Sequence, residues 1–293
     1  MRVLVLGGTG SIGRPILREL LREGHDVVAL VRSADSADRV AALGARPLAG
    51  DISVPHRWLE GAPRWDAVIH AAATFDASEE ETDRRLLDAL LPYLAAADHP
   101  VRFIYTGGCW LYGATGDSLA TEATAFDPLP AYAWCLPHMG RVLAAPGIEA
   151  MVIHPAMVYE PAGGVFERFR SDAIAREAVR VVSSEHVRWP LVHAEDLAVL
   201  YRLALEAGAA GECYIGSAIE GMPVGRIARA YARRYGTRHL DPEICPAQQF
   251  AAELGPWAYG YALDQRLSGG KARRRLGWRP RHLDPEGEIA ALA

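Results

Sequence analysis

The chain has 293 residues, of which 50% are hydrophobic and 23% are charged, and its formal net charge is −5 at pH 7. This length can build a large core without disulfides or metals, and the composition is that of an ordinary globular protein. No apolar stretch approaches the roughly 20 residues of a membrane span, and the acidic charge balance argues against a nucleic-acid surface. We therefore expect a globular protein whose partners include neither nucleic acid nor membrane.

Cysteine usage and the first residues indicate a reducing compartment. The four cysteines lie far apart and form no CxxC pair, so we expect reduced thiols, no disulfide and no metal site. The chain starts with a strand-like run that lacks the pattern of a secretory signal, which favours a cytoplasmic protein. Lys271 is the only lysine among the 31 basic residues.

Apolar periodicity predicts alternating strands and helices in the first half of the chain. Strands are predicted at residues 3–6, 27–31, 46–49, 67–70, 101–106 and 150–154. Helices are predicted at residues 15–23, around 40–43, and at 79–97 and 139–144. This alternation is typical of an α/β fold with a doubly wound parallel sheet, the Rossmann architecture.

The alternation loosens after residue 160. Helices are predicted at residues 165–177, 194–207 and 224–235, with a strand at 212–215. No long linker separates this half from the first. We therefore predict a dinucleotide-binding core at residues 1–160, with residues 161–293 forming mainly a smaller substrate-binding lobe that is interleaved with the core.

A glycine-rich turn lies where a parallel α/β sheet binds dinucleotides. Gly7, Gly10 and Gly13 follow the first predicted strand and open the first predicted helix. Side chains there would block a pyrophosphate, which rests on backbone N–H groups and the helix dipole. The strand before the turn and the helix after it are the context that such a motif requires. We predict a dinucleotide site; a glycine turn without a ligand is the alternative.

Arg32 and Ser33 follow the second predicted strand, where an acidic residue would hold the ribose 2′-hydroxyl of NAD. A guanidinium binds phosphate through two parallel hydrogen bonds, so arginine at this place favours a 2′-phosphate. We therefore predict NADPH as cofactor, with NADH possible. The alternative is an arginine that only caps a strand end in solvent.

Several motifs resemble the extended short-chain dehydrogenase/reductase family, which contains the NAD(P)-dependent epimerases and dehydratases. They occur in order along almost the whole chain: the glycine turn, residues 50–52, 70–73, 105–113, 155–159, 192–198 and 271–280. The resemblance implies that the cofactor is bound by Gly7, Thr9, Gly10, Ser11, Ile12, Gly13, Arg32, Ser33, Asp51, Ile52, Ala71, Ala72, Ala73, Thr106, Pro155, Ala156 and Met157.

The same resemblance shows which groups the chain lacks. In the family, a serine or threonine polarises the substrate, and a lysine four residues after a tyrosine lowers the pKa of that tyrosine, which transfers a proton. Tyr132 falls at the tyrosine position, but Leu136 stands at the lysine position and Gly108 at the hydroxyl position. Lys271 belongs to the C-terminal motif, which the resemblance places far from the nicotinamide.

Pro137 alters this segment further. The residue before a proline avoids α geometry, and proline is tolerated only in the first turn of a helix. We therefore expect the helix to begin at Pro137 and Tyr132 to lie on a loop, where it is either a catalytic residue or a packing residue at the rim of the pocket.

Carbonyl reduction is chemistry that such a cleft can still perform. Positioning supplies much of the lowering of the barrier, and the proton can come from Tyr132, Thr106, water or the substrate itself. Aromatic and sulfur-containing side chains near the expected pocket suit a planar ligand, and core packing is the alternative for them. The predicted substrate contacts are Gly108, Cys109, Trp110, Tyr112, Trp134, His138, Met139 and Phe166.

We predict a ketoreductase for a small aromatic substrate that assists through its own hydroxyl group. In this the chain resembles atypical family members that reduce angucyclinone carbonyls during polyketide tailoring. One alternative is a nucleotide-sugar epimerase or dehydratase, against which Leu136 argues because sugar oxidation needs a tyrosinate base. The other is a non-catalytic NADP(H) sensor. We expect a monomer or a homodimer.

Overall fold

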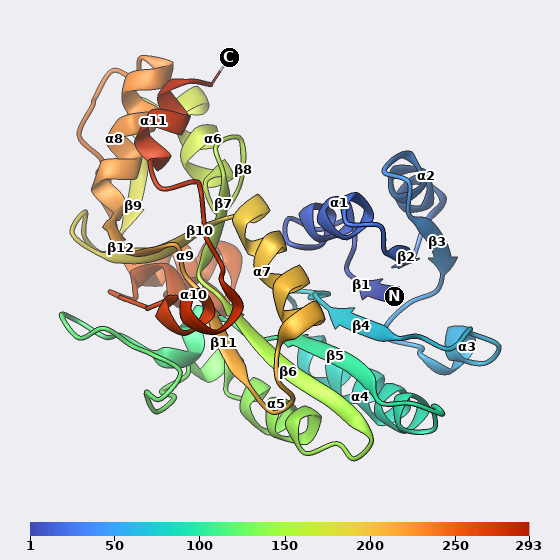
Figure 1. Ribbon diagram of the computed structural model, residues 1–293. Coiled ribbons are helices and arrows are strands. Elements are labelled where there is room, and N and C mark those ends of the chain that lie inside the picture. The colour runs from blue at the N-terminus through green and yellow to red at the C-terminus, as the bar shows by residue number, and fades with distance from the viewer. Residues whose placement is uncertain (293) are drawn as a thin grey trace.

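The structure is a computed structural model and describes residues 1–292. Its largest element is a seven-stranded parallel sheet in the order β11-β6-β5-β4-β1-β2-β3 (Figure 1). The strands are β1 (Arg2–Leu6), β2 (Asp26–Val31), β3 (Arg46–Ala49), β4 (Ala67–His70), β5 (Val101–Thr106), β6 (Ile148–Pro155) and β11 (Cys213–Gly216). The predicted Rossmann fold class is confirmed.

Helices cover both faces of this sheet. They are α1 (Gly13–Arg22), α2 (Ala34–Ala42), α3 (His56–Leu59), α4 (Glu79–Ala95), α5 (Cys135–Leu143) and α7 (Ala194–Ala207). Val3 and Val5 of β1 pack in one core with α1 and α7, whereas Leu4 and Leu6 pack in another with α4 and α5. Successive strand residues point to opposite faces, which is why this central strand is apolar at every one of these positions.

The rest of the chain builds a smaller lobe around a four-stranded sheet, in the order β12-β10-β7-β8, and a two-stranded sheet of β9 and β13. These strands are β7 (Met157–Glu160), β8 (Gly163–Gly164), β9 (Arg180–Val182), β10 (Arg188–His193), β12 (Ile219–Pro223) and β13 (Glu243–Cys245). The later helices are α6 (Glu167–Ala175), α8 (Val224–Tyr235), α9 (Ala247–Leu254), α10 (Gly270–Leu276) and α11 (Pro285–Ala290). Figure 1 shows α6, α8 and α11 together, on the side away from β1 to β3.

The chain crosses between the two parts more than once. After the lobe strand β10, helix α7 packs on the large sheet, and β11 then pairs in parallel with β6. Three 3₁₀ turns lie at the junction or near it: η1 (Cys109–Tyr112), η2 (Pro130–Tyr132) and η3 (Pro256–Ala262). Turns η2 and η3 are in contact with each other.

The helix that follows Tyr132 differs from the prediction. It was expected to begin at Pro137 but begins at Cys135, and Pro137 occupies its first turn, where the missing N–H group is tolerated. Tyr132 ends the 3₁₀ turn η2 and does not lie on an irregular loop. The sequence patterns also predicted none of the strands β7, β8, β9, β10, β12 and β13. Within residues 1–292, no helix is both long and apolar enough to cross a membrane.

Candidate functional site

The glycine turn between β1 and α1 combines tight packing with one open position. Gly7 has a φ of +85°, and a Cβ there would lie 2.5 Å from the carbonyl oxygen of Ala71. A Cβ on Gly13 would collide with the carbonyl oxygen of Gly7. At Gly10 the nearest atom to such a Cβ is that same oxygen, at 3.4 Å. The fold therefore requires two of the glycines, and the third leaves room for a ligand.

The N-terminus of α1 faces this turn without a side-chain cap. Ile12 occupies the cap position, and its side chain cannot accept hydrogen bonds from the free N–H groups of the first turn. Thr9 and Ser11 beside it are exposed. The partial positive charge of a helix N-terminus binds phosphate groups. The turn therefore fits the pyrophosphate of a dinucleotide, as the sequence predicts.

Arg32 lies exposed directly after β2, and the described part of the chain offers it no ion pair or side-chain hydrogen bond. Ser33 has a structural role, because its Oγ accepts a hydrogen bond from the N–H of Ser36 at 3.2 Å and caps α2. The guanidinium of Arg32 is therefore available for a phosphate, whereas the Ser33 hydroxyl is already engaged.

The segments predicted to hold adenine and nicotinamide lie near the glycine turn. The N–H of Ala71 donates to the last carbonyl of β1 at 3.0 Å, which places residues 71–73 beside Gly7. After β3, Oδ1 of Asp51 accepts a hydrogen bond from the N–H of Ser53 at 2.8 Å and closes a turn. The first four strands thus bring the predicted cofactor residues together at one edge of the sheet.

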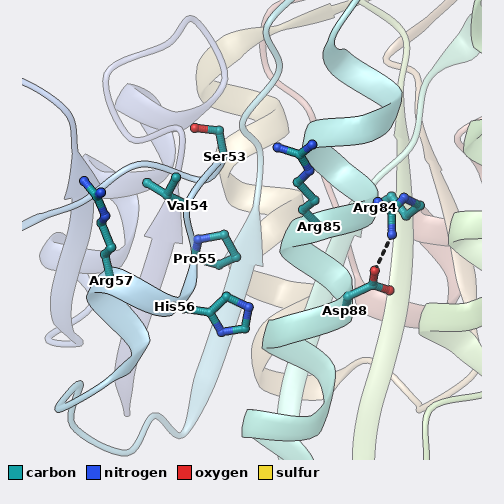
Figure 2. A pocket seen from close by; sticks show the side chains of 8 residues that line it. All are labelled: Ser53, Val54, Pro55, His56, Arg57, Arg84, Arg85 and Asp88. Carbon is teal, nitrogen blue, oxygen red and sulfur yellow. Dashed lines mark hydrogen bonds and ion pairs between the residues drawn. The ribbon is translucent and has the colours of Figure 1, made fainter.

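A cavity of about 430 Å³ begins at Ser53, which follows the predicted adenine contacts in the chain (Figure 2). It lies between α3 and α4 and is lined by Ser53, Val54, Pro55, His56, Arg57, Arg84, Arg85 and Asp88. Figure 2 shows basic side chains on both sides of it, with Arg84 paired to Asp88 at 2.6 Å. Neither the predicted adenine contacts Asp51 and Ile52 nor the glycine turn line this cavity.

The strand ends further along the sheet hold the remaining predicted cofactor residues. Pro155, Ala156 and Met157 are buried where β6 passes into β7. Thr106, at the end of β5, shares a hydrogen bond of 2.6 Å with the hydroxyl of Tyr201 in α7. The Thr106 hydroxyl is therefore engaged toward α7, and its catalytic role stays a prediction.

The lysine and hydroxyl positions of the family motif hold no polar side chain. Leu136 packs against the apolar core beneath α4 and α5. Gly108 has extended backbone, and a Cβ there would meet no atom within 4 Å. Lys271 lies on α10, where it pairs with Glu212 and contacts the ring of Tyr214. Its ammonium group is thus engaged beside β11.

The surroundings of Tyr132 shift its pKa in the direction opposite to the shift that a lysine would cause. Burial, and then the negative charge of Glu79, raises the pKa of Tyr132 above its usual value. A phenol in this setting stays protonated at neutral pH. It can donate a hydrogen bond, but it cannot serve as a tyrosinate base.

An aromatic cluster of Trp110, Tyr132, Trp257 and Tyr261 forms where η1, η2 and η3 meet. The ring centroid of Trp110 lies 5.6 Å from that of Tyr132, 6.2 Å from that of Trp257 and 5.7 Å from that of Tyr261. Phe75, in the loop after β4, extends the cluster at 6.1 Å from Trp257, and 59% of Phe75 is exposed. The sequence analysis did not predict Phe75, Trp257 and Tyr261, which lie outside the family motifs, although residues 256–262 are rich in aromatic side chains.

Other predicted substrate contacts are core residues. Cys109, Tyr112, Met139 and Phe166 are at most 5% exposed, and their burial favours the packing alternative. Trp134 is half-buried, and its indole N–H donates to the carbonyl of Ala131 at 3.1 Å. Gly108, Trp110 and Trp134 are the predicted substrate contacts that stay partly exposed.

Asp83 is a buried carboxylate that sequence reasoning also missed. It accepts hydrogen bonds from Nε2 of His70 at 2.7 Å, from Nδ1 of His138 at 2.6 Å and from the hydroxyl of Tyr105 at 2.8 Å. Burial opposes ionisation of Asp83, but these donors together lower its pKa below the usual range. His138 is thus a partner of Asp83, and its predicted contact with substrate stays a prediction.

His193, Glu195 and His282 bring possible metal-ligand atoms within 4.8 Å of one another, among the residues that the structure describes. Nδ1 of His193 accepts a hydrogen bond from the N–H of Glu195 at 3.2 Å and caps α7. A neutral imidazole that accepts at Nδ1 carries its proton on Nε2, so that nitrogen is a donor and does not suit a metal.

Comparisons with known proteins agree with this geometry. Residues 3–216 match the NAD dependent epimerase/dehydratase family. The uncharacterized protein C2A9.02 of Schizosaccharomyces pombe is 30% identical over 307 residues, which cover 100% of this chain and 99% of that protein. The 4-hydroxy-2-methyl-3-oxo-4-farnesyl-3,4-dihydroquinoline-1-oxide ketoreductase of Stigmatella aurantiaca is 27% identical over 318 residues, which cover 98% of this chain and 94% of that protein.

A solved structure shows the same fold. A double mutant of the dTDP-glucose 4,6-dehydratase DesIV of Streptomyces venezuelae matches with a TM-score of 0.82 and 22% identity, covering 99% of this chain and 95% of that chain. The family match spans the glycine turn, the Asp83 network and the Tyr132 segment. The protein is therefore an oxidoreductase that belongs to the NAD dependent epimerase/dehydratase family.

Proposed function

We propose that the protein is an NADPH-dependent ketoreductase that acts on planar aromatic ketones of the angucyclinone type, as in polyketide tailoring. The observation that carries the proposal is the environment of Tyr132, which has no lysine, a raised pKa and an aromatic neighbour in Trp110. Oxidation of an alcohol needs a base to take the hydroxyl proton, whereas reduction of a ketone needs an acid. A site with a protonated phenol and no cationic neighbour therefore favours the reductive direction.

The cofactor preference follows from the first two strands. The glycine turn and the N-terminus of α1 would hold the pyrophosphate, and the guanidinium of Arg32 would hold a 2′-phosphate, which supports NADPH over NADH. When bound, NADPH supplies the hydride. Residues 71–73 and the end of β6 are the parts of the chain that would position the nicotinamide.

The aromatic cluster supports a planar substrate. Indole and phenol rings stack on flat ring systems and exclude water from the reacting carbonyl. A substrate hydroxyl next to the carbonyl would already polarise it through an internal hydrogen bond, which reduces the need for the missing serine at Gly108. A 27% identical relative is itself a ketoreductase of a ring compound, which supports this substrate class.

A nucleotide-sugar dehydratase is the second candidate, and the family match and the fold shared with DesIV favour it. That reaction begins with sugar oxidation. The raised pKa of Tyr132 leaves it without a base at neutral pH, so we place this candidate second.

The test is a turnover assay with purified protein. NADPH or NADH is mixed with a panel of aromatic polyketide ketones, and the loss of reduced-nicotinamide absorbance is followed. In parallel, NAD⁺ and NADP⁺ are mixed with dTDP- and UDP-sugars, and the formation of a 4-keto product is followed. Oxidation of NADPH by at least one ketone is expected. Sugar turnover without ketone turnover would establish the second candidate, and tight NADPH binding without any turnover would indicate a sensor.

A further inference from the structure

Glu79 is the first residue of α4, at the edge of the sheet where the predicted nicotinamide segment ends. It follows residues 71–78, the loop that leaves β4 beside the glycine turn and carries Phe75 of the aromatic cluster. Its side chain is half-buried. The fold therefore holds a carboxyl group directly after the predicted nicotinamide segment, where the family motifs assign no chemistry.

The packing of α4 on α5 brings this carboxyl group to the level of Tyr132. The bond of 2.6 Å between Asp83 and His138 fixes how the two helices align. Glu79 lies four residues before Asp83, on the same face and about 6 Å closer to the N-terminus of α4. Trp134 likewise lies one turn before His138. Glu79 is therefore aligned with residues 132–136, the segment in which Leu136 has replaced the lysine.

No cation within the described chain neutralises Glu79. Arg84 and Arg85, on the same helix, instead pair with Glu81 at 2.7 and 2.6 Å. The titratable groups whose charges act on Glu79 or respond to it include Asp76 before the helix, Asp83 one turn later, Tyr105 on β5, Tyr132 on η2 and Cys135 on α5. The backbone N–H groups of Phe75 and Thr74 donate to Glu79 and lower its pKa, but less than burial and Asp83 raise it.

These surroundings let the carboxyl group hold its proton up to about neutral pH. Burial, and then the charge of Asp83, raises the pKa of Glu79 to about 7. Asp83 itself stays ionised, because His138, His70 and Tyr105 donate to it. Two carboxyl groups on one helix face thus have widely separated pKa values, an arrangement that produces a general acid near neutral pH.

We propose that Glu79 is the proton donor of this enzyme, and that it delivers its carboxyl proton to the oxygen of a ketone bound against the aromatic cluster. The proposal rests on the proposed function. The carbonyl carbon gains a hydride from the reduced nicotinamide, which becomes oxidised, while the C=O π pair moves to oxygen and takes the proton of Glu79. The product is the alcohol, and the Glu79 carboxylate regains a proton from water before the next cycle.

The experiment compares the wild type with Glu79→Gln, using Glu80→Gln as the matched control because Glu80 is the exposed neighbour. With NADPH and a ketone that the wild type reduces, kcat of the wild type should fall as the pH rises through about 7, where Glu79 ionises. Glu79→Gln should lower kcat on the order of 10²-fold at pH 6 and abolish this dependence, since general acids contribute about 10²–10⁴-fold. Glu80→Gln should retain the wild-type rate and pH profile.

A second readout does not depend on turnover. Ionisation of Glu79 beside the aromatic cluster should change the tryptophan emission of the protein without cofactor, with a midpoint near pH 7 that Glu79→Gln removes and Glu80→Gln retains. If Glu79→Gln reduces the ketone at the wild-type rate and with the wild-type pH profile, the role of Glu79 is overturned and the proposed function still stands. Absence of ketone turnover in the wild type would overturn the proposed function, and the role of Glu79 in it. An emission that is flat across pH 5 to 9 in the wild type would also count against a protonated Glu79.

Discussion

Nδ1 of His138 donates a hydrogen bond of 2.6 Å to the carboxylate of Asp83, and this contact joins α5 to α4 beneath the segment that carries Tyr132. His70 and Tyr105 donate to the same carboxylate from β4 and β5. One buried charge thus links four elements around the candidate site, and the positions of Glu79 and Tyr132 both depend on it.

Asp83→Asn should lower the free energy of unfolding by about 2–3 kcal/mol at pH 7, because a hydrogen bond to a charged group contributes about 1.5–3 kcal/mol. Folding lowers the pKa of Asp83, so its contribution is present above the usual pKa of about 3.9 and disappears as the pH falls through the folded value. Urea unfolding at pH 7 and in acid should show the difference shrinking. Asp88→Asn, which breaks exposed pairs with Arg84 and Arg141, is the control and should cost at most about 1 kcal/mol.

Tyr132→Phe should reduce kcat for ketone reduction by about tenfold or less, because a phenol with a raised pKa gives up its proton poorly and contributes mainly a hydrogen bond. Steady-state kinetics with NADPH measure this. A loss of several orders of magnitude would identify Tyr132 as the proton donor and would contradict the role assigned to Glu79.

Leu136→Lys should partly restore the activity of Glu79→Gln. An ammonium group at this position would lower the pKa of Tyr132 and let the phenol donate the proton, as in the family motif. The double variant should therefore reduce ketones on the order of tenfold faster than Glu79→Gln alone. Leu136→Met in the same background is the control, because it fills the core without adding charge. Equal rates in the two double variants would show that the geometry of η2 prevents the interaction.

The sequence predicts the part of this site that depends on local pattern. Buried parallel strands are continuous apolar runs, so β1 and β4 are visible in the sequence, and the glycine turn between β1 and α1 has a fixed spacing. The replacement of the family lysine by Leu136 can be read from the sequence for the same reason, because that position lies four residues after Tyr132. These features require no knowledge of how distant segments pack.

The remainder of the site depends on contacts that local pattern does not encode. Glu79 and Asp83 lie in a helix whose acidic first turn looks like an ordinary solvated end, which favours negative charge in any case. Trp257 and Tyr261 reach Trp110 only because η3 folds back against η2. Burial, which decides whether a carboxylate is a surface charge or an acid with a pKa near 7, appears only once these segments are packed.

Arg32→Glu should exchange the cofactor preference. The guanidinium is exposed and has no partner in residues 1–292, so its replacement should leave the free energy of unfolding within about 0.5 kcal/mol of the wild type. The Kd for NADPH should rise on the order of 10²-fold, because a charge-assisted contact is replaced by repulsion, whereas the Kd for NADH should change little. Titration followed by fluorescence measures both. Arg18→Glu, an exposed site on α1, is the control for net charge; unchanged NADPH binding in Arg32→Glu would show that Arg32 only caps the strand.

Gly10→Ala and Gly13→Ala should separate binding from folding in the same turn. A Cβ on Gly10 has its nearest neighbour at 3.4 Å, so the free energy of unfolding of Gly10→Ala should lie within about 1 kcal/mol of the wild-type value. The added methyl group would nevertheless occupy the space predicted for the pyrophosphate. A Cβ on Gly13 would collide with the backbone of Gly7, and such overpacking costs typically 1–3 kcal/mol or more. Urea unfolding and NADPH titration of both variants check the two effects. Gly10→Ala should lose at least about tenfold in NADPH affinity while it stays folded, because the backbone N–H groups can no longer approach the phosphates. A stable Gly10→Ala protein that binds NADPH as tightly as the wild type would place the dinucleotide elsewhere than across this turn.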